Sequence, residues 1–544
     1  MNSRTAIDEA LDRIAAGPAE VWIDRRADAA IAAECVDADG PLAGRLLAVK
    51  GNIDVAGFRT TAGCPAYGEV AARHAPVVER LEAAGMTVVG TTNMDQFATG
   101  LVGTRTPHGA LTSVLAPELI AGGSSSGSAV AVASGLVDVA LGTDTAGSGR
   151  VPAAMNGIVG FKPTQSIATR LGVVPACRSL DCVSVFARDL DTAWTALGAM
   201  ADPGAHPCTA DPRVIARPRV GVPRRDQLQW FGDVEAATLF DEALERLVAL
   251  GATLVPIDLE PFLAIARLLY EGPWVAERDA AVGDFVRTNQ DAVDPVVREV
   301  ILGAAGIDGA AVFRGLAERD RLLIEAEAEW ATMDVLALPT TPVAPTLVET
   351  LADPHGTHAR LGTYTNFVNL MGLCAVSVPA GVRPSGGPFG LQLIAPAHGD
   401  ALLFEVARRF DLADPDRTIL LAVVGAHLSG LPLNHQLTRR GARLHRRTTT
   451  APRYRLHRLP EDDPPKPALV RVPEGGTRIE VEVWTLDAAA FGSFTALVPP
   501  PLAIGSVELA DGTIVKGFVC EEWAVRGTRD ISAAGGWRAH LSER

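Results

Sequence analysis

Short apolar runs alternate with amphipathic segments along most of this chain, from about residue 44 to residue 425. The apolar runs LLAVKGNIDV, MTVVGTTNM and MDVLALPTTP have the length of buried strands. The segments between them, such as VEAATLFDEALERLVALGA, carry apolar residues at helical spacing. When strands and helices alternate along a chain, the strands form a sheet and the helices pack on its faces. We therefore expect an α/β fold with a central, mainly parallel or mixed β-sheet flanked by helices.

The composition changes after residue 425. Residues 438–458 contain eight arginines, and strand-like stretches such as IEVEVW follow, with DG and GG pairs where turns are expected. A chain of 544 residues is too long for one ordinary core. The arginine run is open to two interpretations, a patch for a polyanion or a solvated linker or subunit contact, and we favour the second. The prediction has three parts: a large α/β domain (1–425), an Arg-rich linker (426–455) and a small β-rich domain (456–544).

Charge and cysteine content exclude several classes of protein. The net charge of −15 argues against broad binding to nucleic acid or to an anionic membrane. No apolar run has the length of a membrane span, and the first 17 residues are too acidic for a signal peptide. The seven cysteines show no C-x-x-C spacing, which indicates reduced thiols rather than disulfides or a zinc site. We expect a cytoplasmic protein.

Lysine is rare in this chain. Of 49 basic residues, only four are lysines, at positions 50, 162, 466 and 516. A guanidinium stays charged, whereas a lysine that is removed from water can lose its proton near neutral pH. Lys50 follows the apolar run LLAV and is therefore a candidate base. The competing interpretation is that these four lysines are simply what drift has left.

Two turns rich in glycine and serine are candidates for chemistry. The first, AGGSSSGSAVAVASG (121–135), continues as helix and core sequence, unlike a Gly/Ser linker, and lacks the pattern of a phosphate-binding loop. The second, LGTDTAGSGRVPAA (141–154), places Ser148 between two glycines. Serine is a weak nucleophile without a base, and neither turn contains a histidine, so Lys50 is the available base. The backbone amides that precede Ser148 are candidate oxyanion donors: those of Thr145, Ala146 and Gly147.

Four motifs together resemble the amidase signature enzymes, serine hydrolases with a Ser–Ser–Lys triad: VKGNIDVAG, GGSSSGSA, GTDTAGS-x-R-x-PAA and GFKPT. The resemblance implies that Ser148 is the acylated nucleophile, that Lys50 is the base, and that Ser124 bridges them and is held by a cis peptide to its neighbour. It also implies the amidase signature fold and a reaction that needs no metal or organic cofactor. Many members have glycine where this chain has Ala146, so we expect a narrower oxyanion hole.

Within this family, nearly the whole chain resembles the allophanate hydrolases. The similar segments include LLYEGPWVAER (268–278), VVGAHLSGLPLNHQL (423–437) and IEVEVW in the β-rich domain. The resemblance implies hydrolysis of allophanate, a urea that bears a carboxylate, to ammonia and carbon dioxide through an acyl-enzyme, in urea degradation. Arg278 would bind the carboxylate and Tyr270 would supply a hydroxyl beside it. The other expected substrate contacts are Gly122 and Gly123.

The β-rich domain has two candidate roles by the same resemblance. It either assists the loss of carbon dioxide from the first product or only scaffolds an assembly. The candidate participants are His435 and Glu521. We expect a homodimer and an association with urea carboxylase.

Three alternatives remain. The amidase subunit of a tRNA-dependent amidotransferase ordinarily lacks a β-rich tail. A generic amidase would prefer uncharged amides. A noncatalytic scaffold that kept the fold would have no need of Lys50.

Overall fold

The computed structural model describes residues 3–205, 216–412, 419–440, 442–459, 464–486 and 488–542. The chain divides into two compact units, Met1–Asp411 and Leu412–Arg544. Each unit has hydrophobic clusters of its own. We describe the two units separately.

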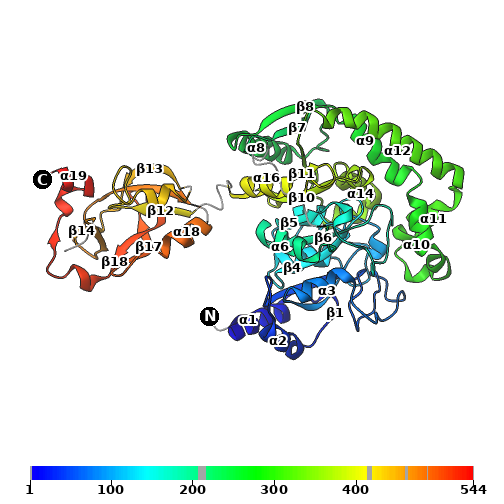
Figure 1. The fold of residues 1–544 in the computed structure, drawn as a ribbon, viewed down its shortest axis with the longest axis horizontal. Helices are drawn as coiled ribbons and strands as arrows, with labels where there is room; N and C mark the ends of the chain where they lie inside the picture. The colour runs from blue at the N-terminus through cyan, green and yellow to red at the C-terminus, as the bar shows by residue number, and fades with distance from the viewer. Residues whose placement is uncertain are drawn as a thin grey trace. The chain divides into compact units, whose positions relative to one another are not determined.

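An eleven-stranded sheet forms the centre of the first unit (Figure 1). In sheet order, its strands are β1 (Trp22–Arg25), β3 (Met86–Thr92), β2 (Arg45–Lys50), β4 (Val139–Asp144), β6 (Cys182–Ala187), β5 (Val159–Lys162), β10 (Cys374–Val382), β11 (Pro388–Ala395), β9 (Val335–Pro339), β7 (Arg219–Pro223) and β8 (Thr253–Ile257). β2 is parallel to β3 and β4, and β7 is parallel to β8 and β9, whereas the other pairs are antiparallel. The expected mixed α/β sheet is confirmed.

Helices cover both faces of this sheet. Leu47 and Val49 of β2 pack into the cluster on one face, and Leu46 and Ala48 pack into the cluster on the other. One face is covered by α3 (Pro76–Ala83), α6 (Leu190–Met200), α8 (Val234–Ala249) and α16 (Asp400–Leu412). The other is covered by α1 (Ser3–Ala16), α2 (Asp28–Asp37), α4 (Ser126–Ala133), α9 (Glu260–Glu271), α12 (Gly309–Trp330) and α15 (Asn366–Leu370). Burial on both faces explains why the strands read as unbroken apolar runs.

The other described helices of the first unit are α5 (Val151–Met155), α10 (Val275–Thr288), α11 (Pro295–Leu302), α13 (Leu347–Ala352) and α14 (Pro354–Gly362). No single helix in the described part of the chain is long and apolar enough to cross a bilayer. Residues 295–306 and 309–330 pass that test only as a pair, with a bend of 101° between them.

The second unit is rich in strands, as expected. One sheet has the order β13 (Arg443–Thr449), β16 (Glu480–Leu486), β12 (Ile419–Val423), β18 (Ile514–Cys520) and β17 (Leu502–Glu508). The other has the order β15 (Pro467–Arg471), β14 (Tyr454–Arg458) and β19 (Arg529–Asp530). Its helices are α17 (His435–Thr438), α18 (Ala488–Thr495) and α19 (Trp537–Ser542). The core includes the buried side chains of Tyr454, Phe494 and Trp537.

The domain boundaries differ from those that we expected. β12 ends before residue 425 but pairs with β16 and β18 of the second unit. The segment 426–455, expected as a linker, contains β13, which pairs with β16 at the edge of the same sheet. Its Arg447 makes an ion pair of 3.1 Å with the buried Glu482. An edge strand with polar, outward-facing residues has no apolar periodicity, so its sequence resembles that of a linker.

Candidate active site

Lys50 and Ser124 meet inside the first unit. Lys50 is the last residue of β2 and is fully buried. Its Nζ donates hydrogen bonds of 2.8 Å to Ser124 Oγ and of 2.8 Å to Thr143 Oγ1 on β4. β2 and β4 are parallel neighbours, so their carboxyl ends lie at the same edge of the sheet. The fold thereby joins two residues that are 74 positions apart in sequence.

The environment of Lys50 favours the neutral amine. Burial lowers the pKa of Lys50 to about 7, against the opposing effect of the negative charges of Asp95, Asp181 and Asp144. Those three carboxylates are themselves buried. A lysine with this pKa is neutral in a large fraction of molecules at neutral pH, and it can therefore accept a proton.

Ser124 lies at the turn that leads into α4. The peptide bond between Gly123 and Ser124 is cis, as the family resemblance implied. Ser124 O accepts a hydrogen bond of 3.1 Å from the amide of Asp95. The amide of Gly123 donates to Leu101 O at 2.8 Å, and a Cβ at this position would lie 2.2 Å from the Asp95 carboxylate. The donor of Gly123 is thus used within the protein, whereas we expected this residue to contact substrate.

Ser148 lies in the turn between β4 and α5. It is buried, and its Oγ donates a hydrogen bond of 3.4 Å to Gly100 O. Among the described residues, no hydrogen bond joins Ser148 Oγ to Ser124 Oγ. The first link of the expected relay, from Lys50 to Ser124, is therefore present, and the second, from Ser124 to Ser148, is not formed among the described residues.

A buried ion pair holds this turn. Arg150 Nε and Nη2 each lie 2.9 Å from one oxygen of Asp144, and both side chains are fully buried. Burial raises the pKa of Asp144, but the charge and hydrogen bonds of Arg150 outweigh it and leave that pKa lowered. Arg150 also donates to Gln392 at 3.1 Å and to Asn369 at 3.2 Å. It is therefore a bracing residue rather than a cation open to substrate.

One expected oxyanion donor is already engaged. The amide of Gly147 donates to Asp144 Oδ1 at 2.9 Å, which corrects the expectation that it points into the hole. Thr145 Oγ1 donates to the buried Asp181 at 2.6 Å and so fixes the turn from the other side. Apart from the regular hydrogen bonds within strands and helices, the backbone amides of Thr145 and Ala146 donate to no other described residue. They therefore remain the candidate donors to the oxyanion.

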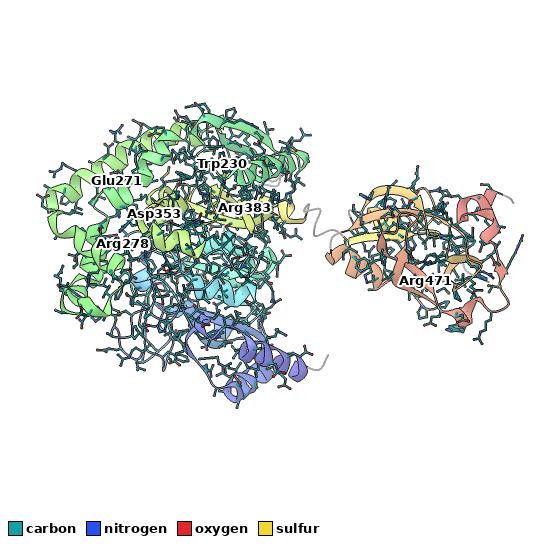
Figure 2. All side chains as sticks on the ribbon, turned by 180° about the vertical axis from the view of Figure 1, so that it is seen from behind. Trp230, Glu271, Arg278, Asp353, Arg383 and Arg471 are labelled. Atoms are coloured by element: carbon teal, nitrogen blue, oxygen red, sulfur yellow. The ribbon has the colours of Figure 1, made fainter. Side chains whose placement is uncertain are left out.

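Arg278 and Tyr270 lie together, as the family resemblance implied. Arg278, on α10 (Figure 2), is buried; its Nη1 donates to Thr99 Oγ1 at 3.0 Å and its Nη2 to Tyr270 OH at 3.5 Å. Its Cζ lies 5.5 Å from the centre of the Tyr270 ring. No carboxylate of the described residues lies within 4 Å of its guanidinium. A buried cation without an ion pair is well suited to bind an anionic group.

Two residues that sequence reasoning missed adjoin this pair. A cavity of about 680 Å³ has Tyr270, His358 and Arg105 in its wall. His358 Nε2 lies 3.2 Å from Tyr270 OH. Arg105 Nη1 and Nη2 donate only to carbonyl oxygens, those of Thr99 at 3.0 Å and of Pro354 at 2.9 Å. Arg105 lies in TRTPHG and His358 in PHGTHARLG. Neither segment has a spacing pattern that marks these residues as functional.

The two candidates of the second unit are separate and exposed. His435 Nδ1 contacts Pro432 O at 2.8 Å, and the Glu521 carboxylate accepts from the Trp523 indole. The half-buried His427 is better enclosed: its ring is stacked on Phe518 with 5.0 Å between ring centres. Burial lowers the pKa of His427. His427 lies in VVGAHLSG, part of a segment that resembles the allophanate hydrolases. That resemblance is the sequence signal by which it could have been found.

Metal-ligating side chains do not gather in the described parts of either unit: no group of three His, Cys, Asp or Glu side chains there is placed to hold an ion. The six described cysteines are buried and free. Cys208 lies outside the described residues.

The fold and the site define an amidase. A family model described as Amidase matches residues 6–404, so the chain belongs to the amidase family. A second model, described as the allophanate hydrolase C-terminal domain, matches residues 419–542.

Individual relatives cover both units. The chain is 43% identical to the urea amidolyase of Lachancea kluyveri and 42% identical to that of Saccharomyces cerevisiae. Each match covers 92% of this chain and 30% of the relative, so the chain spans less than a third of these relatives' length. A solved structure of Kluyveromyces lactis allophanate hydrolase is 38% identical, with a TM-score of 0.72, over 100% of this chain and 97% of that one. A glutamyl-tRNA(Gln) amidotransferase subunit of Haloarcula marismortui is 34% identical over 66% of this chain and 93% of that protein.

Proposed function

We propose that this chain hydrolyses allophanate to ammonia and carbon dioxide in urea degradation. The observation that carries the proposal is the buried guanidinium of Arg278, which has no ion pair with any described residue and lies beside Tyr270. A generic amidase for neutral substrates has no use for an uncompensated buried cation, which is costly to bury. The similarity to allophanate hydrolase over both units supports the same substrate.

The acylation step uses the groups around Lys50. Neutral Lys50 accepts the proton of Ser124 while Ser124 accepts that of Ser148, whose Oγ bonds to the carbonyl carbon of the terminal amide. The amides of Thr145 and Ala146 donate to the oxyanion. When the intermediate collapses, the C–N bond breaks, and the proton returns through Ser124 to the nitrogen, which leaves as ammonia.

Water then cleaves the acyl-enzyme. Ser124 and Lys50 accept a proton from the water as it attacks, and Ser148 leaves with that proton. The product is N-carboxycarbamate, which loses carbon dioxide to leave carbamate, and the carbamate breaks down to a second ammonia and a second carbon dioxide. Assistance of this loss by the second unit belongs to the proposal, with His427 a better-enclosed candidate than His435 or Glu521.

The assembly also belongs to the proposal. Urea amidolyase is a longer protein than this chain, which supports an association with urea carboxylase. A homodimer in the cytoplasm is the expected state, and size-exclusion chromatography with light scattering measures it.

Ammonia release from allophanate, malonamate and a neutral amide tests the substrate assignment. We expect Ser148→Ala to abolish release from all three. Arg278→Ala should raise KM for the two carboxylates by about 10- to 100-fold, because a charge-assisted contact is lost, and should leave the neutral amide unchanged. Allophanate hydrolysis by Arg278→Ala at the wild-type KM would refute the role of Arg278, and a preference of the wild type for the neutral amide would favour a generic amidase.

A further inference from the structure

The hydroxyl of Tyr270 lies between a cation and an imidazole. Arg278 Nη2 is 3.5 Å from it on one side, and His358 Nε2 is 3.2 Å from it on the other. The His358 ring meets the Tyr270 ring edge to face, with 4.9 Å between centres and 89° between planes. His358 therefore has both a polar and a ring contact with Tyr270, and it is placed to orient the hydroxyl.

His358 carries no charge in this setting. It is 9% exposed, and burial lowers the pKa of His358 well below the usual value, with the positive charges of Arg105 and Arg278 acting in the same direction. A neutral imidazole has one donor and one acceptor nitrogen. Its Nε2 can thus accept from the tyrosine hydroxyl or donate to it, according to the tautomer.

Arg105 ties the helix of His358 to the loop of Thr99. Its Nη2 donates to the carbonyl of Pro354, the first residue of α14, and its Nη1 donates to Thr99 O. Thr99 Oγ1 in turn accepts from Arg278. No carboxylate of the described residues lies within 4 Å of the Arg105 guanidinium. Two cations without an ion pair to a described carboxylate therefore adjoin the Tyr270–His358 pair: Arg105, in the wall of the cavity, and Arg278.

We propose that His358 is a positioning residue for the carboxylate of the substrate, acting through the hydroxyl of Tyr270. In the arrangement described here, Arg278 donates to the hydroxyl oxygen, and the hydroxyl hydrogen points to Nε2 of His358. When a carboxylate binds, the hydroxyl turns its hydrogen to that group. His358, in the wall of the cavity, gives its Nδ1 proton to solvent and takes a proton from solvent at Nε2, which then donates to the hydroxyl oxygen. The exchange leaves the net charge of His358 unchanged. This inference rests on the proposed function, because it concerns the same anionic substrate.

The experiment compares two histidines of α14. His358→Leu removes the polar contact. The control His355→Leu changes an exposed histidine one turn earlier in the wall of the same cavity, which contacts Glu299 at 3.4 Å and makes no hydrogen bond with Tyr270 in the described structure. We expect His358→Leu to raise KM for allophanate and malonamate about tenfold with little change in kcat, and to leave a neutral amide unaffected. His355→Leu should match the wild type. His358→Gln, whose amide nitrogen reaches the position of Nε2, should recover most of the loss and shows that the effect is not one of folding.

A double variant tests whether His358 acts through Tyr270. If it does, adding His358→Leu to Tyr270→Phe raises KM no further, since the hydroxyl that His358 orients is already gone. Additive losses, or equal losses on charged and neutral amides, would overturn the inference.

Calorimetry separates this inference from the proposed function. Malonamate is titrated into Ser148→Ala, with and without His358→Leu. Absence of malonamate binding to Ser148→Ala overturns the anionic substrate site and the inference with it. Equal affinities in the two variants overturn the role of His358 alone.

Discussion

Lys50 shows how opposing effects on one residue produce a usable base. Burial disfavours its charged form, and the negative charges of three buried carboxylates favour that form, which leaves the pKa at about 7. Burial without those carboxylates would lower the pKa further and make the amine a weaker base. An exposed lysine would stay protonated and could not accept a proton from Ser124.

The pH dependence of the reaction should follow this residue. Only neutral Lys50 accepts a proton, so kcat/KM should rise with pH through about 7 and level off above it. The rise should be measured as a pH–rate profile with a neutral amide. Such a substrate does not itself titrate, so the acid limb of the profile reports on the enzyme. Lys50→Met should lower kcat by about 10⁴-fold. An acid limb centred far from neutrality would contradict the assignment of the base.

Lys50 should also lower the stability of the folded state. Its pKa is lower in the folded state than in the unfolded chain, so the unfolded state binds an extra proton between about pH 7 and the ordinary value of lysine, and stability rises with pH across that window. At pH 8, the inactive Lys50→Met should therefore melt at a higher temperature than the wild type. Calorimetry at pH 8 makes the comparison, and a lower melting temperature would show that the ammonium is stabilised in the folded state.

The helix α4 illustrates how an element places a reactive side chain. Its first turn follows Ser124, and through Gly127 it packs close to the backbone that precedes β1 and follows β3. A Cβ at this glycine would lie 2.6 Å from both Asn93 N and Val21 O. The approach that carries Ser124 to Lys50 thus depends on the absence of a side chain.

Gly127→Ala tests that close contact. The methyl group has no room and must push α4 outward, so we expect a loss of about 1–3 kcal/mol in stability and a lower kcat. Gly198→Ala is the matched control, because this helical glycine of α6 has nothing within 4 Å of a Cβ. The control should gain up to about 1 kcal/mol. Midpoints of urea unfolding measure both, and equal midpoints would show that α4 adjusts freely.

At the scale of the whole molecule, each of the two units has stabilising contacts of its own. The buried carboxylate of Glu482 holds the second unit together. It accepts from Ser429 N at 2.7 Å, from Arg447 at 3.1 Å and from Arg538 at 3.0 Å. These partners come from a loop, an edge strand and the C-terminal helix of that unit.

Glu482→Gln should therefore weaken the second unit alone. The substitution removes the ion pairs and places the amide NH2 group of the glutamine against other hydrogen-bond donors. We expect the free energy of unfolding of the second unit to fall by about 1–3 kcal/mol. Calorimetry should show the second unit melting earlier and the first unchanged, with ammonia release at the wild-type rate. A parallel fall in ammonia release would show that the units depend on each other.

The sequence by itself determined the α/β class, and its resemblance to a known family predicted the pairing of Lys50 with Ser124 and the adjacency of Tyr270 and Arg278. It could do so because strands buried on both faces leave continuous apolar runs, and because reactive turns and cations form recognisable motifs. Only the tertiary structure decided which donors are free, since the amide of Gly147 is engaged by Asp144 and that of Gly123 by Leu101. The tertiary structure also decided that His358 faces Tyr270 and that the arginine run joins a sheet edge. These contacts form between segments far apart in the chain, and neither a lone histidine nor a polar edge strand has a periodicity that predicts its partner.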